Sequence, residues 1–159
     1  MAVDMFLKLD GVKGEAHGHG HKDEIDVLAF SWGMSNAHSH IGSGHGAGKV
    51  NIQDISFTHY IDTASSKLLL SVAQGDHIKE GTLTVRKQAG GKPVDYLKIK
   101  ITDVFVTSVS TGGSGGEDRL TENFTLAFNK VEVTYTAQDE KGGGKAGTPF
   151  TWNVKENKK

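Results

Sequence analysis

Alternating apolar and polar positions occupy most of the chain and predict a protein made mainly of β-strands. In the first such segment, residues 4–10, Met5, Leu7 and Leu9 alternate with charged residues. β-branched and aromatic residues dominate the later segments, which are 24–32, 50–60, 82–88, 94–110, 124–135 and 150–154. A small antiparallel β-barrel with one α-helix leaves few strand edges exposed, and it is the fold class we expect.

Segment 24–32 has two faces of different composition. Leu28, Phe30 and Trp32 are the bulky side chains, so we expect them to point into the barrel core. The opposite, outward face would then carry Ile25, Val27, Ala29 and Ser31. Because this outward face is small and weakly polar, Ser31 is a candidate for contact with a bound protein.

Segment 94–110 changes character along its length. Lys98 and Lys100 give way to Val104 and Val106 on one face, while the other face stays apolar. A strand that is apolar on both faces needs cover from the helix of its own subunit or from a neighbouring subunit. Segment 124–135 also shifts its apolar positions from even to odd, and a one-residue β-bulge near Asn129 or Lys130 would explain the shift.

One helix is predicted between residues 62 and 75. Asp62 or Thr63 supplies the N-terminal cap and Gly75 ends the helix. The residues expected to face the sheet are Ala64, Leu68, Leu69, Val72 and Ala73. Such a short helix is marginal in water by itself, so it must dock on the sheet.

The 159 residues are expected to form a single domain, 1–159, with a long loop at 33–49 and a flexible C-terminal tail. The chain has no cysteine, which excludes disulfides and thiolate metal sites. Its formal net charge of −1 lacks the basic excess of nucleic-acid binders, so we expect no nucleic-acid partner. No apolar run approaches a membrane span and the N-terminus lacks a signal-peptide pattern, so we expect a protein that is cytoplasmic when made.

Histidines form the strongest candidate for metal chemistry. His17, His19 and His21 alternate, so in an extended chain they would share one face and could hold zinc, nickel or copper. A second group, His38, His40 and His45, lies in the 33–49 loop. Both groups sit in glycine-rich segments that a metal would have to order, so we expect no physiological metal or other cofactor.

Two motifs resemble catalytic or phosphate-binding patterns but lack the required context. Residues 112–116 match G-x-S-x-G around Ser114, yet a nucleophile elbow needs a following helix and a strand-like segment follows instead. Residues 44–49 resemble part of a P-loop, but Ser43 and Val50 occupy positions that require glycine and a hydroxyl residue. The chain is therefore expected not to be an enzyme.

Several blocks of sequence together resemble one family. The longest is Ser-Thr-Gly-Gly-Ser-Gly-Gly-Glu-Asp-Arg-Leu-Thr-Glu-Asn over residues 110–123. Others are Lys-Asp-Glu-Ile-Asp-Val-Leu at 22–28, Ser-Trp-Gly-Met-Ser at 31–35, Gly-Ala-Gly-Lys-Val-Asn at 46–51, Val-Arg-Lys at 85–87 and Trp-Asn at 152–153. These blocks resemble the Hcp family, the tube proteins of bacterial type VI secretion.

The resemblance implies a structural protein whose rings of six subunits stack into a tube. A contractile sheath would drive this tube, with its tip proteins, out of the cell, and the lumen would hold small effector proteins. Ser31 becomes the candidate lumen residue that touches cargo. Candidates for subunit interfaces are Gly46, Gly48, Lys49, Val104 and Val106. The alternative is a monomeric β-domain that binds metal or carbohydrate through its histidine-rich loops.

Overall fold

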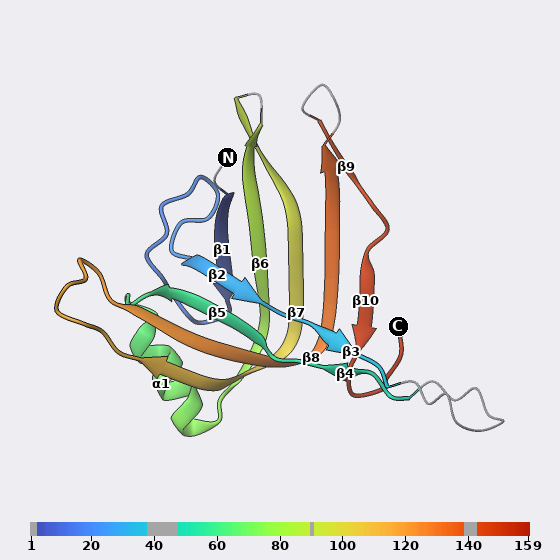
Figure 1. The fold of residues 1–159 in the computed structure, drawn as a ribbon. Coiled ribbons are helices and arrows are strands. Elements are labelled where there is room, and N and C mark those ends of the chain that lie inside the picture. The colour runs from blue at the N-terminus through green and yellow to red at the C-terminus, as the bar shows by residue number, and fades with distance from the viewer. Residues whose placement is uncertain (1–2, 38–47, 90, 139–142) are drawn as a thin grey trace.

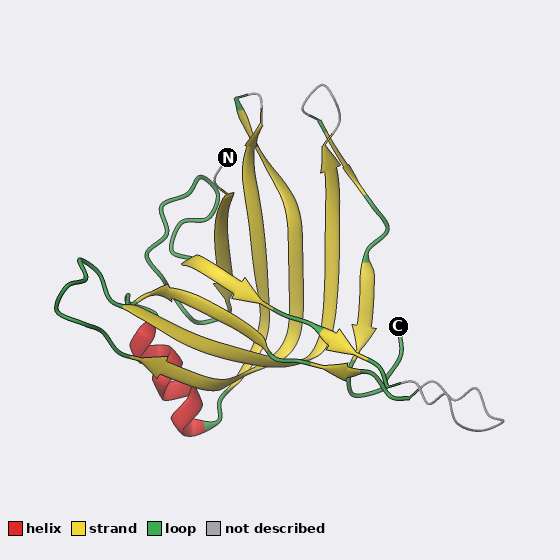
Figure 2. Cartoon of the chain, in the orientation of Figure 1, coloured by secondary structure: helices red, strands yellow, loops and turns green. Residues whose placement is uncertain are grey.

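The computed structural model describes residues 3–37, 48–89, 91–138 and 143–159 and consists mainly of β-strands (Figure 2). The elements in chain order are β1 (Val3–Leu9), β2 (Ile25–Ser31), β3 (Met34–Ser35), β4 (Asn51–Ile52), β5 (Ile55–Tyr60), α1 (Ser65–Gln74), β6 (His77–Ala89), β7 (Lys92–Thr111), β8 (Thr121–Gln138), β9 (Gly144–Ala146) and β10 (Phe150–Asn153). Within these residues, no helix is long and apolar enough to cross a membrane.

Six strands close into an antiparallel barrel, as the sequence predicted. The hydrogen-bonded order is β8-β5-β2-β1-β6-β7, and direct pairing of β7 with β8 completes the circle. β9 and β10 extend the sheet on the far edge of β8. The shared core lies inside the barrel, and α1 lies at its lower left, packed against β7 (Figure 1).

The two longest strands bend where their buried faces switch. In β7 the buried positions change from Ile101 to Val104, and in β8 from Phe128 to Val131. The pairing of β7 with β8 keeps one register across this point, so the switch is a corner in both strands and not the β-bulge predicted near Asn129 or Lys130. Asp103 has a φ of 55° at this corner, a left-handed conformation that turns the strand.

A β-bulge in β2 corrects the predicted faces of this strand. Ile25 and Val27 are buried, although we predicted them to point outward. The register with β5 shifts between Val27 and Ala29, so Leu28 is extruded and 41% exposed where the sequence predicted core. After the bulge, Phe30 packs against the core and Ser31 points outward, as predicted.

Helix α1 starts and ends close to the predicted positions. The N-cap residue is Ala64, so the prediction of Asp62 or Thr63 as the cap is wrong; Asp62 instead accepts a hydrogen bond of 2.8 Å at Oδ1 from the Ala64 backbone N–H just before the helix. Gly75 ends it with a φ of 67°, the left-handed conformation typical of a helix C-terminus.

The buried face of α1 differs from the predicted one. Leu68 and Ser71 face the core, but Leu69 is 47% exposed and Val72 36% exposed, so their predicted burial is wrong. Ala73 is exposed as well. The sequence offers apolar residues on two adjacent sides of this helix, and docking on β7 buries only one of them.

Val104 and Val106 belong to the subunit's own core, with exposed fractions of 0% and 6%. This corrects the expectation that they contact a neighbouring subunit. The corner at Asp103 rotates the second half of β7 so that these valines point into the barrel. The side chain between them, Phe105, points outward and is 39% exposed.

The predicted 33–49 loop begins as a short ribbon. β3 pairs antiparallel with β4, which places Met34 opposite Ile52. The indole N–H of Trp32 donates a hydrogen bond of 2.9 Å to the carbonyl of Gln53 at the base of this ribbon. At the other end of the chain, Asn153 and Lys158 exchange backbone hydrogen bonds, so the segment after β10 folds back on it.

Candidate functional site

A four-stranded surface of short, mostly hydroxyl-bearing side chains covers the outside of β2, β5, β8 and β7. The strand registers align Ser31, Ser56, Thr125 and Ser108 in one row across the sheet. They align Ala29, Thr58, Asn123 and Ser110 in the next row. We call these eight residues the small-polar face. All eight are exposed or half-buried.

Hydrogen bonds between strands hold the side chains of the small-polar face. Thr58 Oγ1 donates to Asn123 Oδ1 at 2.5 Å, and the hydroxyls of Ser108 and Thr125 lie 2.6 Å apart. At the border of the face, outside its eight residues, Thr107 beside a bulge in β7 donates to Asp54 Oδ2 at 2.8 Å. Such cross-strand contacts restrict the side chains and keep the surface low in relief.

The small-polar face suits contact with varied protein surfaces better than it suits chemistry. It has no titratable group and no large apolar side chain, so it offers neither an acid–base pair nor a hydrophobic anchor. Its hydroxyl and amide groups can donate or accept hydrogen bonds. Ser31, predicted as the cargo residue, lies at its β2 edge and is exposed.

The inner side of the same strands carries a buried polar network. His59 Nε2 lies 2.8 Å from Glu122 Oε1, and His59 Nδ1 lies 3.7 Å from Asp62 Oδ1. The exposed fractions of the His59 and Glu122 side chains are 0% and 1%. The rings of Phe124 and His59 lie perpendicular to each other, with centroids 5.1 Å apart. The network ties β5, β8 and the start of α1 together.

Charge determines the protonation of His59. Burial lowers its pKa, but the negative charge of Asp62 and the hydrogen-bonded carboxylate of Glu122 outweigh burial, so the pKa is raised overall. The protonated imidazole is thus favoured in the fold. This pair was not among the residues that the sequence singled out. The sequence pattern that could have identified them is their place in the strands. His59 and Glu122 each occupy a position that alternation of apolar and polar residues assigns to the inward side of its strand.

The glycine-rich stretch that resembles the Hcp family connects β7 to β8. A β-carbon on Gly113 would clash with the end of the Leu120 side chain, so glycine here gives that side chain room to pack on the loop. Ser114 lies in a connection between two strands and lacks the helix that a nucleophile elbow requires. The Arg119 guanidinium lies 3.9 Å from the Tyr60 ring centroid and holds the end of the loop on β5.

A small hollow of about 220 Å³ lies beside Arg119. Its lining residues are Glu15, His17, Asp26, Tyr60, Asp62 and Arg119. Burial and the nearby charge of Asp4 raise the pKa of the Asp26 carboxyl. Glu15 Oε2 accepts a hydrogen bond from the Thr63 N–H, so this carboxylate helps fix the segment before α1.

The structure does not gather the predicted histidine group around one point. His21 stacks on Phe6 with ring centroids 4.5 Å apart and pairs with Glu24. His17 lines the hollow, and the carbonyl of His19 accepts a hydrogen bond from Arg86. Among the described residues, no three His, Asp or Glu side chains could hold a metal ion. His38, His40 and His45 lie outside the described residues.

Of the predicted interface glycines, only Gly48 lies in the described part of the chain; Gly46 lies outside it. The Gly48 carbonyl accepts a hydrogen bond of 2.8 Å from Asn36 Nδ2. Its α-carbon approaches the Ala37 carbonyl so closely that an added β-carbon would lie 2.8 Å away. Lys49 is exposed. Gly48 therefore closes the β3–β4 ribbon, and an interface role for Lys49 stays a prediction.

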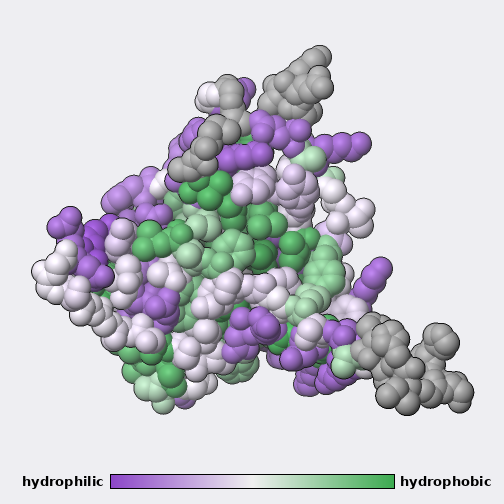
Figure 3. Space-filling model, viewed as in Figure 1, coloured by the Kyte–Doolittle hydropathy of each residue, from purple (hydrophilic) through white to green (hydrophobic). Residues whose placement is uncertain are grey.

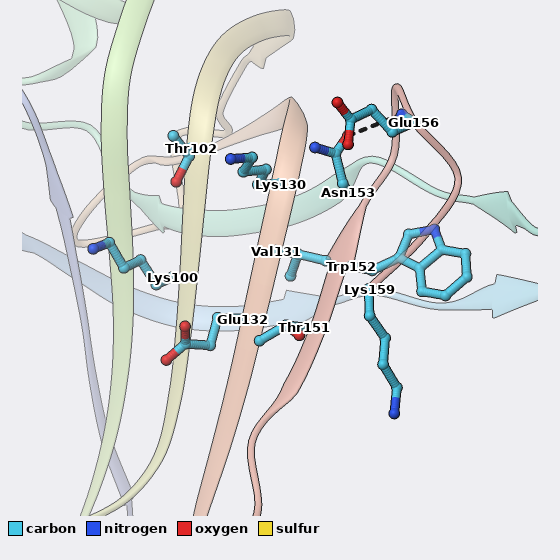
Figure 4. A pocket seen from close by; sticks show the side chains of 10 residues that line it. All are labelled: Lys100, Thr102, Lys130, Val131, Glu132, Thr151, Trp152, Asn153, Glu156 and Lys159. Atoms are coloured by element: carbon cyan, nitrogen blue, oxygen red, sulfur yellow. Dashed lines mark hydrogen bonds between the residues drawn. The ribbon is translucent and has the colours of Figure 1, made fainter.

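A groove of about 350 Å³ runs over β7, β8 and β10 (Figure 4). It is lined by Lys100, Thr102, Lys130, Val131, Glu132, Thr151, Trp152, Asn153, Glu156 and Lys159. Both lysines and glutamates line it, so it does not select a ligand of one charge. The backbone N–H of Glu156 bonds to Asn153 Oδ1 at 2.9 Å and keeps the final turn at the groove's edge.

Comparison with known proteins gives a consistent result. Residues 6–135 match the family described as "Type VI secretion system effector, Hcp". Over 160 aligned residues the chain is 53% identical to the protein hcp1 of Pseudomonas aeruginosa, covering 99% of this chain and 98% of that protein.

Solved structures agree over nearly the whole chain. A type six secretion system protein superposes with a TM-score of 0.92 at 34% identity, covering 99% of both chains. The crystal structure of Hcp1 from Salmonella typhimurium has a TM-score of 0.78 at 38% identity, again covering 99% of both. With the family match, the closed barrel and its single helix, these likenesses show that the chain belongs to the Hcp family of type VI secretion proteins.

Proposed function

We propose that this chain is the subunit of a type VI secretion tube. Six copies close into a ring, rings stack into a tube, and the small-polar face lines the lumen where small exported proteins are held. The observation that carries the proposal is the extent of this face, which spans four strands without a charge or a large apolar side chain. A lumen that passes different proteins needs a surface of this kind.

The proposed mechanism is assembly and passage, without covalent chemistry. The subunit is made in the cytoplasm, forms the tube inside a contractile sheath behind tip proteins, and leaves the cell with them. Family membership supports these partners.

The full-length chain is expected to form rings in solution. Light scattering coupled to a sizing column should give a mass of about 102 kDa, six times the 17.0 kDa of one chain, and negative-stain images should show rings. A mass of one subunit at micromolar concentration would contradict the proposal and favour the metal- or carbohydrate-binding alternative.

Ser31→Gln is expected to lower cargo binding while rings persist. The longer side chain would protrude from the β2 edge of the small-polar face, so a co-expressed small exported protein should be recovered with the rings at a severalfold lower level. The matched control is Thr82→Gln, on the exposed side of β6 opposite Lys100. Equal recovery for both variants would remove Ser31 from the cargo site, and loss of rings would place it at a subunit interface.

A further inference from the structure

A second hollow adjoins the one beside Arg119, at the point where the β-bulge in β2 extrudes Leu28. Its volume is about 230 Å³, and it shares Asp26, Tyr60 and Arg119 with the first hollow. We call it the Leu28 hollow. Pockets for drug-sized ligands usually have volumes of about 300 Å³ or more, so the Leu28 hollow suits a single long side chain.

One wall of the Leu28 hollow is apolar. Val3 and Leu28 are each 41% exposed, and Met5, which lines the same hollow, is half-buried. In Figure 3, hydrophobic residues lie over the start of β2, left of centre, and hydrophilic residues border them. These side chains offer an apolar surface to the aliphatic part of a ligand.

Two carboxylates, those of Asp4 and Asp26, also line the Leu28 hollow. Within the described part of the chain, neither forms an ion pair or a side-chain hydrogen bond. Burial first, and then the charge of Asp4, raise the pKa of the Asp26 carboxyl, and the charges of Arg119 and His17 do not offset them. Asp26 therefore lacks a counter-charge, which a cationic ligand would supply.

The aromatic ring in the hollow already holds a cation of the chain itself. The Arg119 guanidinium lies 3.9 Å from the Tyr60 ring centroid and pairs with no carboxylate among the described residues. The carboxylates that line the two hollows are Asp4, Glu15, Asp26 and Asp62. The basic residues that line them are Arg119 and His17. The surroundings thus favour a cationic ligand over an anionic one.

The Leu28 hollow borders the small-polar face. Tyr60 and Thr58 lie on the same side of β5, and Ala29 follows Leu28 on β2. The small-polar face itself carries no charge and no large apolar side chain, so it offers a bound protein no anchor point. A hollow at its border, with an apolar wall and two unpaired carboxylates, adds such an anchor point.

We propose that the Leu28 hollow binds a lysine or arginine side chain of the protein held in the lumen. The aliphatic part of that side chain packs on Leu28 and Val3, and its charge lies between Asp4 and Asp26. The inference rests on the proposed function and deepens it, because it gives the tube a preference among exported proteins for those with a basic residue at this place.

Peptide binding to the full-length protein tests the proposal. A fluorescein-labelled peptide of alternating lysine and serine should bind at low salt, and a peptide with glutamine in place of lysine should bind about tenfold more weakly. Asp4→Asn combined with Asp26→Asn should weaken binding of the lysine peptide by about tenfold. Leu28→Ser keeps every charge and should weaken it severalfold, because the apolar wall is lost. Fluorescence anisotropy measures each affinity.

The matched control combines Glu80→Gln with Glu132→Gln, which removes two carboxylates that line neither hollow. It should bind the lysine peptide as the natural chain does. Equal binding of the two peptides, an equal loss of binding in the control, or unchanged binding by Leu28→Ser would overturn the inference.

Light scattering on every variant separates this inference from the proposed function. Rings should persist in all variants. Loss of rings when Asp4 and Asp26 are replaced would place the hollow between subunits and overturn the inference while leaving ring formation standing. A monomeric natural chain would overturn the proposed function itself.

Discussion

Glu122→Ala is expected to lower the free energy of unfolding by about 3–5 kcal/mol, the usual cost of removing one partner from a buried charged pair. Glu122 is 1% exposed and bonds to His59, which is fully buried. Without this carboxylate, the imidazole loses its 2.8 Å partner and the space beside it cannot be filled by bulk water. Denaturant unfolding at one fixed protein concentration measures the change, because assembly into the proposed ring would also stabilise the fold.

Glu132→Ala is the matched control on the same strand. Glu132 lies on the exposed side of β8, so its loss should change the unfolding free energy by less than about 0.5 kcal/mol. If both alanine variants unfold at the same denaturant concentration as the natural chain, the buried pair contributes little to stability and the expected cost is wrong.

The same network sets a pH dependence. Because the folded pKa of His59 is raised, the fold binds the imidazole proton more tightly than the unfolded chain does. This stabilisation is complete below the unfolded pKa, about 6.5, and is lost as the pH rises through the folded value. Melting temperatures of the natural chain should therefore fall over that range, and the fall should be smaller in Glu122→Ala.

Phe124→Ala is expected to lower the free energy of unfolding by about 3–5 kcal/mol, as much as Glu122→Ala. Phe124 is fully buried, stacks on Phe57 with ring centroids 5.2 Å apart, and packs against His59. Its removal leaves a cavity that the closed barrel cannot collapse to fill. For a chain of this size the melting temperature should drop by roughly 10 °C, which differential scanning calorimetry can measure.

Leu120→Ala provides the comparison for Phe124→Ala. Leu120 is 42% exposed in the loop before β8, so truncation removes less buried surface and should cost about 1 kcal/mol or less. If the melting temperature of Phe124→Ala equals or exceeds that of Leu120→Ala, the barrel repacks around the missing ring.

The sequence by itself determined the fold class, the position of the helix and the family. Apolar alternation located the long strands, and Gly75 marked the helix end because a left-handed residue there favours glycine. The blocks of sequence around residues 110–123 were enough to indicate the Hcp family. Alternation also put Ser31 outward, and the structure agrees because Ser31 lies beyond the bulge.

Only the tertiary structure decided which face of several elements is buried. The alternation in β2 is ambiguous until its pairing with β5 extrudes Leu28, and Ile25 and Val27 then turn inward. The sequence does not distinguish the apolar sides of α1. Docking on β7 buries Leu68 and leaves Leu69 exposed.

The candidate site also depends on contacts between distant segments. Ser31 and Ser108 share a row only because β5 and β8 lie between them in register. His59 and Glu122 are 63 residues apart and meet inside the closed barrel. Side-chain periodicity is a local property that one strand's sequence can show. Bulges, corners and register depend on pairing with the partner strand. They determine which of the two faces of a strand is exposed to solvent.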